Sequence, residues 1–156
     1  MKSRVGVGSC PSKVRIEQSK DLPETVGELI DDSAERDVIL IGDFNHRTDH
    51  QSFEPLTDAD FIFQTRFLNQ ASAAGSYIKT WNPHKSEDLI DHIAIRYSDT
   101  REVVRSSTTV YQIKSKEAGK KYIMRQSDHV PVWTSFYIDS DLDDDCLLYT
   151  SDAADE

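Results

Sequence analysis

Val38-Ile39-Leu40-Ile41-Gly42-Asp43-Phe44-Asn45 is the stretch from which the rest of the sequence can be interpreted. Its four consecutive apolar residues lie between Asp37 and Gly42, which is typical of a strand covered on both faces, so we expect a central strand here. A carboxylate and an amide, Asp43 and Asn45, follow at the end of this strand, where a rigid scaffold can hold them. Because both residue types also favour ordinary turns, the stretch alone is a moderate signal.

Two further stretches place a carboxylate inside or beside an expected strand. Ile90-Asp91-His92-Ile93 lies within the strand expected over residues 89–97, and Ser127-Asp128-His129 immediately precedes the one expected over residues 130–138. A carboxylate on a face that packs against a core needs a partner. Asp91 is therefore harder to explain as a purely structural residue than a turn aspartate would be.

Together these stretches supply side chains that suit metal-assisted attack of water on a phosphate ester. Asp43 can align or deprotonate the water, and Asn45 can donate to a phosphoryl oxygen if the backbone stays extended. Asp128 can bind Mg²⁺ or Mn²⁺, which prefer oxygen ligands. His129 can contact the phosphate or move a proton, and Asp91 can accept a hydrogen bond from it and fix its tautomer.

The three motifs in order resemble the endonuclease/exonuclease/phosphatase superfamily, which has the deoxyribonuclease I-like fold. They are Gly-Asp-Phe-Asn after an apolar strand, Ile-Asp within a later strand, and Ser-Asp-His-Val-Pro before the last strand. The resemblance covers residues 5–138 and only the C-terminal half of such a domain. It implies an α/β (α+β) fold, half of a four-layered sandwich with a mainly antiparallel sheet, and divalent-metal-dependent cleavage of a phosphate ester in nucleic acid or in a small phosphorylated molecule. It also implies catalytic roles for four residues and a metal-binding role for a fifth, namely Asp43, Asn45, Asp91 and His129, and Asp128.

The sequence also departs from the pattern of that superfamily. The metal-binding Asn and Glu of the family lie upstream, in a half of the domain that this sequence lacks, and Ser9 stands where the family commonly has a histidine. We therefore expect the C-terminal part of a phosphoesterase that has little activity alone. The alternative is a non-catalytic binding module that kept the fold and lost part of the site. His46 follows Asn45 closely enough to contact a substrate, although a solvated loop is the simpler explanation.

Length and composition agree with one partial domain. We expect residues 1–145 to form it, and residues 146–156 to be a tail that resembles the translation of a sequencing adapter or is disordered. The net charge of −10 is unlike that of a general nucleic-acid binder. Neither a secretory leader nor a membrane-spanning apolar run is visible, and the two cysteines fit no zinc or disulfide pattern.

Further elements are expected from local patterns. The expected helix begins at Ser19 or Asp21, has Pro23 in its first turn and ends near residues 33–35. The remaining expectations, in chain order, are a strand over residues 5–7, a polar loop over 12–20, a short helix within 46–60 anchored by Phe53 and Leu56, core residues in 61–63 and 67–68, a β-rich segment over 101–113 and a basic loop over 114–121. A half-domain would leave part of its sheet uncovered, so we expect marginal stability or aggregation.

Overall fold

The computed structural model describes residues 11–31, 36–68, 79–81, 88–98 and 100–138. The strand expected over residues 5–7, the position of Ser9 and the tail at 146–156 lie outside these residues. The helices and strands, in chain order, are α1 (Pro11–Ile30), β1 (Ile39–Asp43), the 3₁₀ helix η1 (Gln51–Phe53), α2 (Glu54–Asp58), β2 (Phe61–Phe63), β3 (Asp91–Arg96), β4 (Thr109–Val110), α4 (Lys116–Arg125) and β5 (Val132–Trp133).

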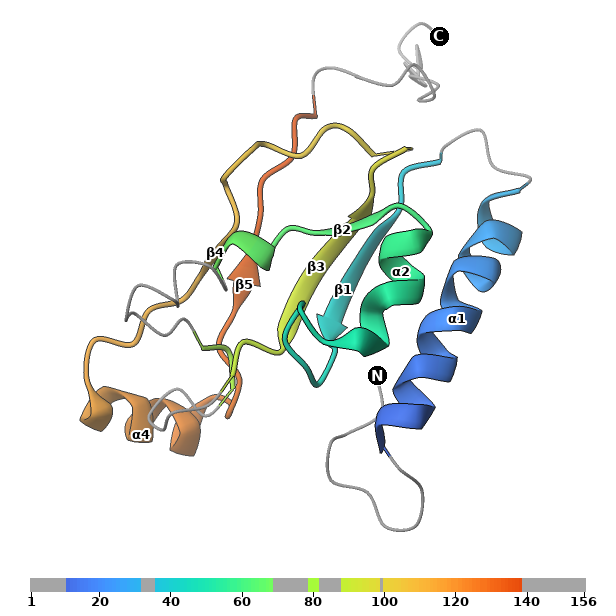
Figure 1. Ribbon diagram of the computed structural model, residues 1–156. Helices are drawn as coiled ribbons and strands as arrows, with labels where there is room; N and C mark the ends of the chain where they lie inside the picture. The colour runs from blue at the N-terminus through green and yellow to red at the C-terminus, as the bar shows by residue number, and fades with distance from the viewer. Residues whose placement is uncertain (1–10, 32–35, 69–78, 82–87, 99, 139–156) are drawn as a thin grey trace, which may run out of the picture.

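Within the described residues, the fold consists of two antiparallel sheets and the helices beside them. β1, β3 and β2 form a three-stranded sheet in the order β1-β3-β2, and β4 pairs with β5 in a second sheet. Figure 1 shows α1 and α2 on one side of the three-stranded sheet and the β4–β5 pair on the other. The expected mixed fold with a mainly antiparallel sheet is confirmed.

The main core lies between the helices and the three-stranded sheet. Leu40 of β1 and Ala94 of β3 are paired residues that face this core, and Phe53 and Leu56 anchor the segment after β1 as expected. Apolar side chains from all these elements form one cluster, which contains Val26, Val38, Phe44, Phe53, Leu56, Phe61, Phe63 and Ala94. A smaller cluster of Leu89, Val110 and Val130 lies beside the second sheet.

The prediction that β1 is a central strand is wrong for the described residues. Within them β1 pairs only with β3 and lies at the edge of its sheet. Leu40 packs against the core, but Ile39 and Ile41, on the opposite face, are 40% and 73% exposed. The continuous apolar run therefore has one covered face and one open face.

The prediction for the first helix was wrong about where it starts. α1 begins at Pro11, so the segment expected to be a polar loop is helical, and Pro23 lies inside the helix rather than in its first turn. The buried face of this extra part carries Arg15 and Ser19, which are 2% and 0% exposed. Polar residues at inward positions hide the apolar period on which a sequence-based prediction depends.

The C-terminal part also differs from expectation. The basic loop expected over 114–121 is largely the helix α4, whose N-cap Ser115 accepts a hydrogen bond from the backbone N–H of Ala118. The long β-rich segments contribute only β4 and β5, with one further bridge between Val103 and Phe136. Phe67, expected in the core, is 55% exposed. Among the described residues, no helix combines the length and apolar character needed to cross a lipid bilayer.

Candidate functional site

The register of the three-stranded sheet brings two of the motifs together. β1 ends at Asp43 and the antiparallel β3 begins at Asp91, so these two aspartates are directly opposite each other. The backbone N–H of Phe44 donates to the carbonyl of Ile90 at 2.8 Å and extends the pairing by one step. Phe44 is buried and makes edge-on contacts with Phe53 and Phe63, at ring-centroid distances of 5.8 and 5.4 Å. The buried phenylalanine thus fixes the end of β1.

The third motif is joined to the other two through Thr80 and Trp81. The buried Thr80 hydroxyl accepts hydrogen bonds from the backbone N–H groups of Ile90 and Asp91, at 2.9 and 3.0 Å. The Thr80 carbonyl accepts from the backbone N–H of Val130 at 2.7 Å, and Trp81 forms a bridge with His129. Thr80 is therefore a positioning residue, and no motif in the sequence singles it out.

The hydrogen bond expected between Asp91 and His129 is present. His129 Nδ1 lies 2.8 and 3.0 Å from the two Asp91 carboxylate oxygens. Because an ionised carboxylate only accepts hydrogen bonds, the partner assigns the proton to Nδ1 of the histidine. Within the part of the chain that the structure describes, Nε2 has no hydrogen-bond partner. The His129 side chain is 30% exposed, so Nε2 can face a ligand.

Asn45 is coupled to Asp43, but not through an extended backbone. Asn45 has a φ of 58°, in the left-handed region, which its short polar side chain tolerates. Its backbone N–H donates to Asp43 Oδ1 at 2.7 Å, and its side-chain Nδ2 donates to Asp43 Oδ2 at 3.1 Å. Two donors thus orient the Asp43 carboxylate, whereas donation by Asn45 to a phosphoryl oxygen remains a prediction.

Asp128 lies next to the pair but is not part of an assembled metal site. It is exposed, and one of its carboxylate oxygens accepts a hydrogen bond from the Trp81 ring nitrogen at 3.3 Å. Among the described residues, no three His, Cys, Asp or Glu side chains are grouped so that they could hold a metal ion. The role of Asp128 as a ligand of Mg²⁺ or Mn²⁺ therefore stays a prediction.

His46, the candidate substrate contact, is held in place by its neighbours. Its Nε2 accepts a hydrogen bond from the buried Arg15 guanidinium at 2.8 Å, and its ring stacks on that of His50 with centroids 3.7 Å apart. Its carbonyl accepts from His92 Nε2 at 2.7 Å. His46 is thus half-buried rather than in a freely solvated loop. Its contact with a substrate stays a prediction.

His92 points into the core, on the face of β3 opposite to that of Asp91. It is 1% exposed, and its Nδ1 is 2.6 Å from the Thr65 hydroxyl. Burial lowers the pKa of His92 to about 4, although the hydrogen bond to the His46 carbonyl and the charge of Asp43 oppose this shift. The His92 side chain is therefore neutral near pH 7 and serves packing rather than proton transfer.

Comparison with known proteins gives similarities in fold. No family model and no curated protein matches the chain. A mannosyl-6-phosphatase from Bacteroides thetaiotaomicron is similar over 88% of this chain and 49% of its own, with 20% identity and a TM-score of 0.49. An endonuclease/exonuclease/phosphatase family protein from the same organism is similar over 81% of this chain and 45% of its own, with 21% identity and a TM-score of 0.45. The chain spans about half the length of these structures.

Proposed function

We propose that the chain is part of a phosphoesterase that hydrolyses a phosphodiester or phosphomonoester by attack of water. The observation that carries the proposal is the Asp91–His129 hydrogen bond at 2.8 Å, formed at the point where Asp43 faces Asp91 across the strands. A carboxylate-oriented histidine beside a second, separately oriented carboxylate is an arrangement suited to proton transfer and to contact with a phosphoryl group.

Each side chain has a distinct task in the proposal. Asp43, with both oxygens held by Asn45, accepts a hydrogen bond from the attacking water and aligns it. His129 presents Nε2 to a phosphoryl oxygen or to a proton in transit, because Nδ1 is engaged by Asp91. Asp91 acts through His129 and is a positioning residue. We also propose that hydrolysis depends on Mg²⁺ or Mn²⁺ and that Asp128 would be one of the ligands of the cation.

The test is hydrolysis of bis-p-nitrophenyl phosphate and p-nitrophenyl phosphate, with Mg²⁺, with Mn²⁺ and with a chelator. We expect little turnover by the 156 residues alone, because the described residues do not assemble a metal ligand set. Whatever turnover is measured should need the cation and should fall by roughly 100-fold or more in Asp43→Ala and in His129→Ala. Robust turnover that is unchanged in both variants would refute the assignment.

A non-catalytic binding module is the second candidate, and Ser9, at the position where the resembled family commonly has a histidine, favours it. The two candidates differ in what a longer form of the protein would contain. An upstream Asn and Glu in early strands, together with cation-dependent turnover, would support the hydrolase. Phosphate-ester binding without a requirement for a cation, and without turnover, would support the module.

A further inference from the structure

A cavity of about 850 Å³ lies along β2 and the segment that follows β3. None of Asp43, Asn45, Asp91 and His129 lines it. Tyr97, which does, directly follows β3, so it lies about 20 Å along the strand from Asp91 at roughly 3.3 Å per residue. The cavity is thus outside the proposed catalytic site, and the volume is within the range of small-molecule sites.

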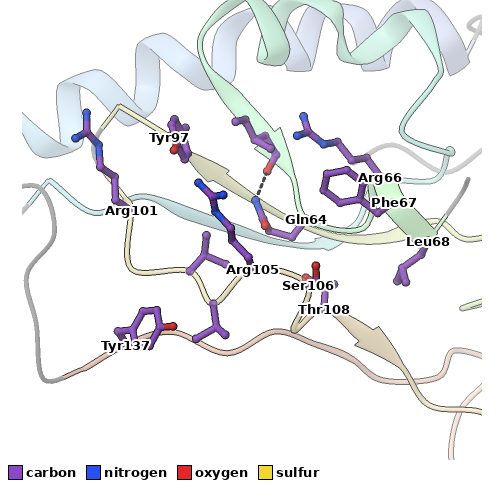
Figure 2. A pocket seen from close by; sticks show the side chains of 13 residues that line it. Gln64, Arg66, Phe67, Leu68, Tyr97, Arg101, Arg105, Ser106, Thr108 and Tyr137 are labelled. Atoms are coloured by element: carbon purple, nitrogen blue, oxygen red, sulfur yellow. Dashed lines mark hydrogen bonds between the residues drawn. The ribbon is translucent and has the colours of Figure 1, made fainter.

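The side chains that line the cavity carry positive charge, whereas the chain as a whole is negatively charged. The chain carries 28 acidic and 18 basic residues, yet Arg66, Arg101 and Arg105 line the cavity and no carboxylate does. Figure 2 shows Arg101 and Arg105 reaching in the same direction from the segment after β3, with Arg66 from the segment after β2. Within the described part of the chain, no carboxylate pairs with any of these three guanidinium groups. The carboxylate of Glu102 instead accepts from the backbone N–H of Arg101 at 2.8 Å.

Aromatic rings stand beside these charges. Tyr97 and Tyr137 line the cavity and are 42% and 53% exposed, so both have surface that a ligand can reach. The Arg66 guanidinium lies 4.7 Å above the centre of the Phe67 ring. Stacking of this kind occupies the face of the guanidinium and leaves its N–H edge for an anion. Ser106, another lining residue, has a φ of 60°, a conformation that costs free energy in a non-glycine residue and recurs at ligand sites.

We propose that this cavity binds a small organic anion, in which a phosphate or carboxylate group is attached to a planar ring. The planar guanidinium group of arginine can donate two parallel hydrogen bonds to a phosphate or to a carboxylate. The chemistry that the two kinds of ligand share is therefore a pair of acceptor oxygens. A free phosphate ion is too small to fill about 850 Å³, whereas a ring between the tyrosines would use the apolar part of the lining. The inference is independent of the proposed hydrolysis, because no residue is shared.

Isothermal titration calorimetry of the full chain tests the proposal with four probes: adenosine monophosphate, adenosine, inorganic phosphate and indole-3-carboxylate. We expect adenosine monophosphate or the aromatic carboxylate to bind at least ten-fold more tightly than adenosine or phosphate. Whichever of these two probes binds more tightly shows whether the cavity prefers a phosphate or a carboxylate group. In the variant Arg101→Gln/Arg105→Gln that binding should fall by ten-fold or more, and both side chains are exposed, so the fold should persist.

The matched control is Lys120→Gln/Lys121→Gln, which removes the same charge from exposed positions on α4 and should leave the affinity unchanged. Failure of both organic anions to bind at millimolar concentration would overturn the proposal. So would adenosine binding as tightly as its monophosphate, or binding that persists in the arginine variant, since such binding would belong to another site.

Discussion

At the scale of single residues, His92 has the most clearly perturbed ionisation. Its folded-state pKa is lowered to about 4, against an unfolded value of 6.5, because it is buried. Between pH 4 and pH 6.5 the unfolded chain binds more protons at this histidine than the folded chain does. The free energy of unfolding is therefore not reduced by His92 above pH 6.5, and it decreases as the pH falls toward 4. The shift corresponds to about 3 kcal/mol of stability lost once the pH is below both pKa values.

Urea unfolding of the wild type and His92→Gln between pH 4.5 and 7.5 measures this effect. The variant should show a smaller dependence of the free energy of unfolding on pH. Thr65→Val is the control, because it removes the 2.6 Å hydrogen bond but keeps the buried imidazole, and it should retain the wild-type slope. Equal slopes in the wild type and His92→Gln would contradict the assigned cause.

The sequence motifs predicted most residues of the candidate site, but not the residues that hold them in position. Asp43, Asp91 and His129 could be identified because they follow, lie within or precede an expected strand, and antiparallel pairing places the first two opposite each other. Thr80 could not, because a lone threonine carries no periodic signal and its role depends on hydrogen bonds to Ile90 and Asp91. The left-handed Asn45 was missed because the backbone was assumed to stay extended.

At the scale of elements, packing of helices on the sheet decides stability. Leu56 of α2 is fully buried in the main core, whereas Leu29 of α1 is 77% exposed. Leu56→Ala removes packed methyl groups and leaves a cavity, and should cost about 2–5 kcal/mol. Leu29→Ala makes the same chemical change at the surface and should change stability by only about 0.5 kcal/mol. Thermal or urea unfolding followed by circular dichroism compares the two, and similar losses would show that α2 does not dock as described.

The elements differ in how closely the sequence predicted their bounds. β3 was expected over residues 89–97 and spans Asp91–Arg96, whereas the strand expected over residues 130–138 is reduced to β5, Val132–Trp133. α4 was missed because its lysines and Gly119 look like a loop, although Ser115 as N-cap and Glu117 in the first turn are helix-start signals that were present. In α1, Pro23 misled the placement because a proline is commoner in a first turn than in a helix interior.

At the scale of the whole molecule, the open face of β1 is the chief liability. Ile41 is 73% exposed on a strand that, within the described residues, is an edge, and Ile39 beside it is 40% exposed. Apolar edge strands promote association between chains. We expect concentration-dependent self-association, reduced in Ile41→Lys and unchanged in Met124→Lys, which adds the same charge at another exposed apolar position. Sedimentation velocity measures this, and a monodisperse monomer at all concentrations would contradict the expectation.

The most direct test of the central claim asks whether Asp91 acts through His129 on a phosphate ester. Affinity for p-nitrophenyl phosphate should be measured for the wild type, Asp91→Asn, His129→Gln and the double variant. We predict about a ten-fold loss in each single variant, and a double variant no weaker than His129→Gln alone, because the two side chains work as one unit. Unchanged affinity in His129→Gln, or losses that multiply in the double variant, would contradict the account.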